Sequence, residues 1–228
     1  MRVGGLQKVS GADYPGLLSA VVFTQGCNFR CPYCHNPALV PPFGELIDED
    51  GVLAFLGTRA KYLDAVVISG GEPTLVPDLE DYLGRIKRLG FRVKLDTNGS
   101  RPEAVKSLAE RRLLDYVAMD LKSHPAAYPG ELAAPEESAA ILETVGLLKT
   151  LGLPHEFRTT CVSPFVDERA IEAIAKAAAG DSILYLQELK PKRVFNPGFM
   201  ARHPDQPGPE DLSRWRAVAG RWLPCRVR

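Results

Sequence analysis

The sequence predicts an α/β fold, a partial TIM-type (β/α)6 barrel of parallel strands with a C-terminal extension. Six short runs of β-branched or apolar residues are bounded by Gly, Asp or Pro, and helical patterns separate them. This alternation of strand and helix predicts right-handed parallel crossovers, which build either an open doubly wound sheet or a barrel. Six units favour a partial barrel, although periodicity alone does not close it.

The boundaries of these elements follow from local signals. Asp48 begins the first helix, Pro102 lies in the first turn of the third, and Gly90 and Gly180 follow helix ends. The predicted strands are 20–26, 65–71, 92–99, 114–122, 156–162 and 182–189, and the predicted helices are 48–60, 78–89, 101–111, 136–150 and 167–179.

The region after the sixth strand has a different composition. Residues 190–210 are rich in Pro and predict a loop wrapping the barrel mouth, before a last helix near 210–221. We therefore expect a barrel domain over residues 1–189 and a C-terminal loop and helix over 190–228 that pack on it.

Composition excludes several classes of protein. The chain has 228 residues, 45% hydrophobic and 25% charged, enough for one core or two small ones. A formal net charge of +0 provides no global basic field for nucleic acid or an anionic membrane. No signal peptide and no apolar run of about 20 residues is present, so we expect a cytoplasmic protein with no membrane partner. Five Cys, three of them between Cys27 and Cys34, favour a reducing compartment and metal chemistry.

Chemically distinctive residues follow the first four predicted strands. The carboxyl ends of parallel strands meet at the edge where ligands bind, so these residues are expected to converge on one site. They are Cys27, Cys31 and Cys34 after the first strand, Gly70, Gly71 and Glu72 after the second, Asp96 and Thr97 on the third, and Asp120 and Lys122 on the fourth.

The stretch "GCNFRCPYCHNP" allows three kinds of cysteine site. A glutaredoxin-type dithiol needs a helix behind its first Cys, which Pro37 and the prolines after it prevent. A structural zinc with His35 as fourth ligand would require adjacent ligands, Cys34 and His35, that point in different directions. A cubane iron-sulfur cluster takes one thiolate per iron, and three thiolates leave the fourth iron open for a substrate or cofactor.

The C-x3-C-x2-C spacing with Tyr33 before the last Cys, followed by "GGEP", resembles the radical S-adenosylmethionine enzymes. The segments "DYPG", "FTQGCNFRCPYCHNP", "SGGEPTL", "DTNG" and "MDLK" are more closely similar to the activating enzymes of glycyl radical enzymes. The resemblance covers about residues 1–190, and within this family it is nearest to the activators of anaerobic ribonucleoside-triphosphate reductase.

The resemblance implies a set of cofactors and roles. Cys27, Cys31 and Cys34 would hold a [4Fe-4S] cluster whose open iron binds the amine and carboxylate of S-adenosylmethionine. Reductive cleavage would give a 5'-deoxyadenosyl radical that removes hydrogen from a partner, a glycyl radical enzyme in an anaerobic pathway, with a flavodoxin or ferredoxin as electron donor. The residues expected to contact S-adenosylmethionine are Gly70, Gly71, Glu72, Asp96, Thr97, Asp120, Lys122 and Arg158, with a small cation possible near Asp96 and Asp120.

Structural alternatives stay open for several of these residues. Glu72 could be a solvated side chain in an ordinary Gly turn, and Asp120 with Lys122 a solvated charge pair. Arg158 could form a structural ion pair instead of contacting a carboxylate of the cofactor. Cys161 is expected to be buried packing and Cys225 a surface or tail thiol, so both are expected outside the site.

Three alternative functions also remain. One is an activase of pyruvate formate-lyase. Another is a radical S-adenosylmethionine enzyme that acts on a small molecule of the deazapurine type. The third is a non-catalytic iron-sulfur or zinc module, which leaves "GGEP" and "DTNG" unexplained.

Overall fold

The computed structural model describes residues 1–190 and 194–228, and its contacts divide the chain into two compact units. The predicted boundary at residues 189 and 190 divides the chain differently and stays a prediction. Residues 191–193 of the predicted C-terminal segment lie outside the described residues. The first unit comprises Met1–Asn28, Ala38–Thr97 and Glu103–Val117, and the second comprises Phe29–Pro37, Asn98–Pro102 and Ala118–Arg228.

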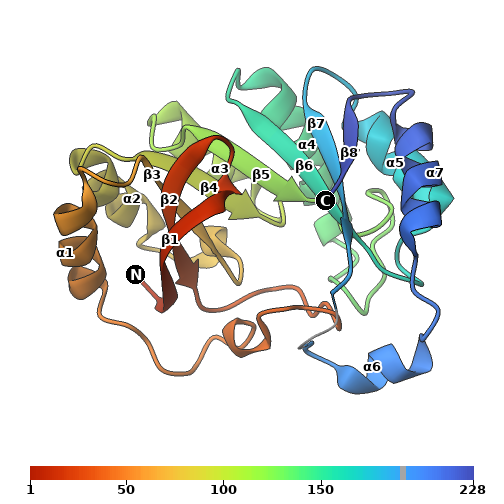
Figure 1. The fold of residues 1–228 in the computed structure, drawn as a ribbon, viewed down its shortest axis with the longest axis horizontal. Coiled ribbons are helices and arrows are strands. Elements are labelled where there is room, and N and C mark those ends of the chain that lie inside the picture. The colour runs from red at the N-terminus through yellow and green to blue at the C-terminus, as the bar shows by residue number, and fades with distance from the viewer. Residues whose placement is uncertain (191–193) are drawn as a thin grey trace. The chain divides into compact units, whose positions relative to one another are not determined.

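The first unit contains a parallel sheet extended by an antiparallel hairpin (Figure 1). Ile68 of the central strand lies opposite Val22 on one side and Leu95 on the other, and these aliphatic side chains are fully buried. The predicted strands and helices of this region are confirmed. The elements are β1 (Val3–Tyr14), β2 (Leu17–Thr24), α1 (Glu49–Arg59), β3 (Ala65–Gly70), α2 (Leu79–Arg88), β4 (Arg92–Thr97) and α3 (Pro102–Glu110), with 3-10 turns at Pro37–Leu39 and Pro73–Leu75.

Strand β1 is absent from the sequence prediction. It pairs with β2 in antiparallel register through a tight turn in which Gly16 has a φ of 74°. Its side chains are mostly exposed or half-buried, and its register shifts near Gly5 and Ser10. An edge strand of this kind lacks the apolar run that identifies buried strands, so the parallel alternation begins only at β2.

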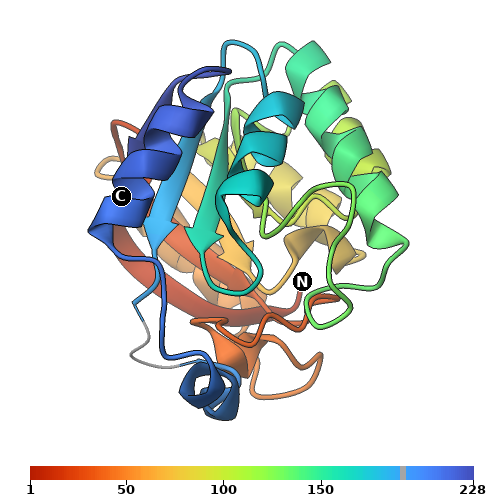
Figure 2. The same ribbon diagram turned by 90° about the vertical axis from the view of Figure 1, so that its right-hand side faces the viewer.

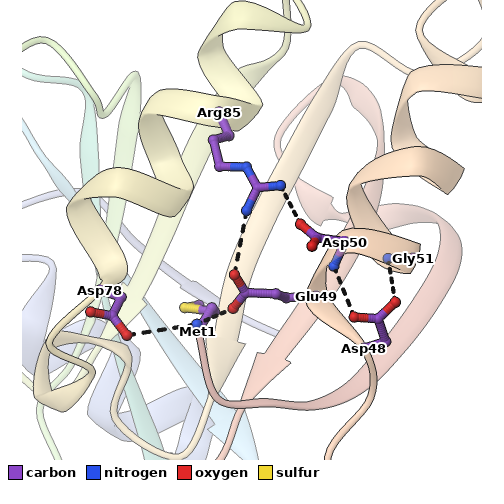
Figure 3. Close-up of polar contacts among 7 residues, drawn as sticks. All are labelled: Met1, Asp48, Glu49, Asp50, Gly51, Asp78 and Arg85. Atoms are coloured by element: carbon purple, nitrogen blue, oxygen red, sulfur yellow. Dashed lines mark hydrogen bonds and ion pairs between the residues drawn. The ribbon is translucent and has the colours of Figure 1, made fainter.

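The first turn of α1 is fixed by capping and by ion pairs (Figure 3). The Asp48 carboxylate accepts hydrogen bonds from the backbone N–H of Asp50 at 3.3 Å and of Gly51 at 3.0 Å. Arg85 of α2 pairs with Glu49 at 3.3 Å and also with Asp50. The predicted helix start at Asp48 is therefore confirmed, and the same turn is tied to the next helix.

The second unit repeats the strand-helix pattern. Phe157 of β6 lies opposite Leu184 of β7, and both side chains are fully buried. Helices α5 and α7 pack side by side, with α7 also against β7 and β8 (Figure 2). The elements are β5 (Tyr116–Asp120), which starts in the first unit, α4 (Glu137–Thr150), β6 (His155–Cys161), α5 (Glu168–Ala177), β7 (Ile183–Glu188), α6 (Pro197–Arg202), α7 (Pro209–Ala219) and β8 (Cys225–Val227).

Two C-terminal elements correct the sequence analysis. Residues 197–202, predicted as loop, form α6, whose N-cap Asn196 accepts a hydrogen bond from the Phe199 N–H at 3.1 Å. Cys225, expected as a surface or tail thiol, lies half-buried in β8, which pairs in parallel with β7. Both elements are so short that they present no periodic pattern.

The predicted fold class is confirmed as α/β with a parallel-strand sheet. Over the described residues the strands follow chain order, β1 to β8, and the sheet is not closed. Within that same part of the chain, no helix combines the length and the hydropathy needed to cross a membrane.

Candidate functional site

The glycine turn after β3 packs against the segment that leads into the cysteine motif. Gly70 has a φ of 115°, and a Cβ on Gly71 would lie 2.1 Å from the carbonyl oxygen of Gly26. The N–H of Glu72 donates to that same carbonyl at 2.8 Å. A side chain at Gly71 would therefore push two backbones apart. Close approach of Gly70 and Gly71 to a ligand stays a prediction.

Glu72 is buried and held by hydroxyl groups. Its side chain is 1% exposed, which excludes the solvated alternative. Oε1 accepts hydrogen bonds from Thr97 Oγ1 at 2.7 Å, Thr74 Oγ1 at 2.6 Å and the Thr74 N–H at 3.2 Å. A buried carboxylate with several donors on one oxygen has a fixed orientation.

Asp96 is paired with a residue that the sequence analysis missed. Lys94 Nζ lies 2.7 Å from Asp96 Oδ1, and both side chains are largely buried. The two residues are two apart on β4, so they share one face of the strand. The sequence did contain a signal for this ion pair: a Lys stands among apolar residues, two positions before an Asp.

The backbone at Cys27, at the start of the cysteine loop, is held by hydrogen bonds within the first unit. Its N–H donates to the Val40 carbonyl at 3.0 Å, and the preceding N–H, of Gly26, donates to Leu39 at 2.8 Å. The segment around residues 38–40 therefore sets the position of the chain at the first cysteine.

Cys31 and Cys34 form a turn in the second unit. The Cys34 N–H donates to the Cys31 carbonyl at 3.0 Å. Burial raises the pKa of the Cys31 thiol to about 11, although the nearby Lys122 ammonium acts in the opposite direction. A thiol of this kind keeps its proton near neutral pH in the metal-free protein, so metal binding must release that proton.

Tyr33, the aromatic residue of the motif, is buried beside Cys31. Its side chain is 3% exposed, and its hydroxyl has no hydrogen-bond partner among the described residues. Burial and then the proximity of Cys31 raise the pKa of Tyr33. The ring packs on Phe165, with centroids 6.0 Å apart.

Asp120, Lys122 and Arg158 form one charged cluster. Asp120 Oδ1 lies 2.7 Å from Arg158 Nε, and Asp120 Oδ2 lies 3.0 Å from Lys122 Nζ. The three side chains are 14% to 29% exposed, so Asp120 and Lys122 are not the solvated pair that the sequence left open. The structural ion pair that the sequence left open for Arg158 is present, and its partner is Asp120.

Burial and charge act against each other in this cluster. Burial favours the neutral form of Asp120, but the Arg158 and Lys122 cations outweigh it and hold the pKa of Asp120 below its usual range. Burial likewise disfavours the Lys122 ammonium, yet the Asp120 carboxylate raises the pKa of Lys122. All three side chains are therefore charged at neutral pH. Asp96 and Asp120 each face a side-chain cation, and a small cation near them stays a prediction.

The cysteine loop is tied to the C-terminal segment at two points. Asn196 N–H donates to the Pro32 carbonyl at 2.8 Å, and His35 Nε2 lies 3.0 Å from the carbonyl oxygen of Lys190. His35 thus bonds to backbone, as a loop residue does. Cys161 is 1% exposed, which confirms its expected burial in packing.

The chemistry of the donor set fits an iron-sulfur cluster. All five cysteines are free thiols, and three of them occupy one short loop. A cubane cluster takes one thiolate for each of its coordinated irons, which three cysteines in one loop can supply.

Comparison with known proteins identifies the family. The Radical SAM superfamily model matches residues 21–178, which includes the cysteine motif and the glycine turn. The chain belongs to the radical SAM superfamily. Members of this superfamily use a [4Fe-4S] cluster and S-adenosylmethionine, and these are the cofactors of this radical SAM enzyme.

Two curated relatives and one solved structure place the chain further. A Methanocaldococcus jannaschii protein named "Putative glycyl-radical enzyme activating enzyme" is 37% identical over 204 residues, 86% of this chain and 83% of that protein. The pyruvate formate-lyase-activating enzyme of Staphylococcus aureus is 32% identical over 130 residues, 51% of each chain. Streptococcus suis SuiB bound to S-adenosylmethionine superposes with a TM-score of 0.62 at 15% identity, over 89% of this chain and 48% of SuiB, and supports the fold.

Proposed function

We propose that this radical SAM enzyme installs a glycyl radical on a partner enzyme, with anaerobic ribonucleoside-triphosphate reductase as the first candidate. The observation that carries the proposal is the 37% identity to the Methanocaldococcus jannaschii relative over 86% of this chain and 83% of that protein. The match to a pyruvate formate-lyase-activating enzyme supports the same chemistry and makes pyruvate formate-lyase the second candidate partner. Function in a reducing cytoplasm belongs to the same proposal, because all five thiols are free.

The cluster ligands in this proposal are Cys27, Cys31 and Cys34. When bound, the reduced cluster supplies the electron that cleaves the sulfonium carbon-sulfur bond of S-adenosylmethionine. The protein provides orientation and electrostatics. Tyr33 and Phe165 exclude water beside Cys31, and a desolvated thiolate is sensitive to the Lys122 charge.

Glu72 is the proposed acceptor for the methionyl ammonium. Thr97 and Thr74 fix its Oε1, so the carboxylate is oriented before the ligand binds. Lys122 and Arg158 are the proposed partners of the methionyl carboxylate or the ribose. Asp120 holds both cations in place through its two ion pairs and raises the pKa of Lys122. Asp96, in its ion pair with Lys94, is proposed to line the cofactor site.

The first experiment tests the radical chemistry. The protein is reconstituted with iron and sulfide without oxygen and reduced with dithionite, and 5'-deoxyadenosine is measured from S-adenosylmethionine. We expect nucleoside from wild type and from Cys161→Ser, a buried thiol outside the motif, and none from Cys31→Ser. Equal nucleoside from Cys31→Ser would contradict the assignment.

The second experiment tests the partner. The active protein is mixed with anaerobic ribonucleoside-triphosphate reductase or with pyruvate formate-lyase, and the glycyl radical is quantified by electron paramagnetic resonance. A radical on the reductase supports the first candidate. A radical on pyruvate formate-lyase alone would replace it with the second, and a radical on neither while 5'-deoxyadenosine forms would reject both.

A further inference from the structure

A cavity of about 210 Å³ lies beside the cysteine loop within the second unit. The cysteine loop lines part of it, and the segment that leads into and forms α6 lines another part. Its lining residues are Arg30, Pro32, Glu131, Phe195, Asn196, Phe199 and Arg202.

The two segments are joined by backbone contacts. Asn196 donates its N–H to the Pro32 carbonyl at 2.8 Å and caps α6 through its side chain. Arg30 and Pro32 are the chain neighbours of Cys31, and the Arg30 N–H donates to the Leu132 carbonyl at 2.9 Å. Anything bound in this cavity therefore touches the residues on either side of a proposed cluster ligand.

The cavity carries uncompensated positive charge. Neither Arg30 nor Arg202 forms an ion pair with any residue that the structure describes, and the same holds for Glu131. Two guanidinium groups against one carboxylate contrast with the formal net charge of +0 of the whole chain. Phe195, 38% exposed, adds an apolar contact at the rim. The surface thus suits a partner that presents carboxylates around an apolar centre.

We propose that this cavity is the docking site of an acidic one-electron donor protein that reduces the cluster. The proposal rests on the proposed function, since it presumes a cluster on Cys31. The reduced donor loses one electron and the cluster gains it, so the transfer balances without any further reactant. Two observations favour this occupant. Electrons must enter close to the cluster ligands, and the cavity adjoins Cys31. Because the chain as a whole has no net charge to steer a partner, the local charge of the cavity must do so.

The test compares a protein donor with a small reductant. The double variant Arg30→Glu with Arg202→Glu reverses the charge of the cavity. The control, Arg169→Glu with Arg221→Glu, makes the same change in net charge at two exposed arginines elsewhere. Affinity for oxidised flavodoxin is measured by calorimetry at low ionic strength, and cluster reduction is followed by stopped-flow absorbance with reduced flavodoxin and, separately, with dithionite.

We expect the cavity variant to bind flavodoxin at least about tenfold more weakly and to be reduced correspondingly more slowly by it, because charge complementarity sets encounter rates. Reduction by dithionite should match wild type, and the control variant should behave as wild type in every assay. Added salt should weaken binding to wild type and should strengthen the residual binding of the cavity variant, because it screens attraction in the first and repulsion in the second.

Three results would overturn the proposal. The cavity variant could bind flavodoxin as tightly as the control does. It could lose reduction by dithionite to the same degree, which would mean that Arg30 and Arg202 support the cluster itself. It could keep flavodoxin binding yet lose glycyl radical formation under dithionite, which would assign the cavity to the radical acceptor. A cluster that is reduced but never cleaves S-adenosylmethionine would reject the proposed function and leave the flavodoxin binding result to decide the docking site.

Discussion

Two buried tyrosines in the second unit differ in one hydrogen bond. Tyr33 is 3% exposed and its hydroxyl has no partner among the described residues, whereas Tyr128 is 5% exposed and its hydroxyl accepts from the Lys122 N–H at 2.8 Å. A buried polar group without a partner costs desolvation energy, and removal of an acceptor leaves a buried N–H with the same cost. The same change, Tyr to Phe, should therefore have opposite effects.

We predict that Tyr33→Phe raises the unfolding free energy of the metal-free protein by about 1 kcal/mol and that Tyr128→Phe lowers it by about 1 kcal/mol. Urea denaturation of both variants beside wild type measures the two changes. Loss of stability in both would mean that the Tyr33 hydroxyl has a partner in solution.

Thr97 connects two of the motifs through its hydroxyl on Glu72. In Thr97→Val the side chain keeps its shape but Oε1 of Glu72 loses a hydroxyl donor, and the carboxylate is less well fixed. We predict S-adenosylmethionine binding about tenfold weaker, on the scale of one hydrogen bond to a charged group. Thr97→Ser retains the hydroxyl and should bind within about twofold of wild type. Calorimetry on the reconstituted protein measures both, and equal affinity of Val and Ser variants would contradict the role.

The Asp120 cluster should give stability a defined pH dependence. The pKa of Asp120 is lowered in the folded state, so its ion pairs stabilise the fold above the unfolded-state pKa of about 3.9 and this contribution is lost as pH falls through the folded-state pKa. We predict that the stability difference between wild type and Asp120→Asn is largest near pH 7 and shrinks steadily below about pH 4. Urea midpoints between pH 7 and pH 3 test this, and a constant difference would refute it.

The sequence motifs predicted which residues lie in the candidate site. They did not predict which side chains these residues contact. Glu72 and Asp120 were both expected at strand ends. Their contacts with Thr97 and Arg158 depend on how strands pair and on which face each residue occupies, which a single sequence does not state. Lys94 was missed because a buried Lys is unusual unless paired.

At the scale of elements, the two N-terminal helix caps in the first unit form a matched pair. Asp48 accepts two backbone hydrogen bonds at the start of α1, while Asp78, at the same position of α2, caps no N–H group with its side chain. We predict that Asp48→Ala costs about 1 kcal/mol of unfolding free energy and that Asp78→Ala costs less than about 0.5 kcal/mol. Thermal and urea unfolding measure both, and equal losses would mean that charge near the helix end, instead of capping, sets the effect.

Elements that bury one periodic face were predictable, and short or edge elements were not. The helices at 48–60 and 167–179 carry caps and end signals in the sequence, and the six internal strands are apolar runs. Strand β1 is exposed or half-buried along most of its length, α6 is six residues long, and β8 is three residues long. Contacts with other parts of the chain stabilise these three elements, so no local sequence pattern predicts them.

At the scale of the whole molecule, the open sheet requires each end strand to be stabilised by something other than closure. At the C-terminal end, β8 and the residue after it form hydrogen bonds with the backbone of β7. The Glu188 N–H donates to the Arg228 carbonyl at 3.2 Å, and the Arg228 N–H donates to the Leu186 carbonyl at 2.9 Å. Arg228 also pairs with the buried carboxylate of Glu156 at 3.5 Å and lies 3.4 Å from the centre of the Tyr185 ring. Four residues thus complete a sheet edge that would otherwise present free backbone groups.

Removal of residues 225–228 should therefore open the edge of β7. We predict a loss on the order of 2–3 kcal/mol in unfolding free energy, from two or three backbone hydrogen bonds, together with faster amide exchange along Ile183–Glu188. Arg226→Ala, which alters an exposed side chain of the same strand and leaves its backbone, should remain close to wild type. Urea unfolding and hydrogen exchange by mass spectrometry measure both variants. Unchanged exchange along β7 in the truncated protein would show that α7, which packs on the same strand, protects it without β8.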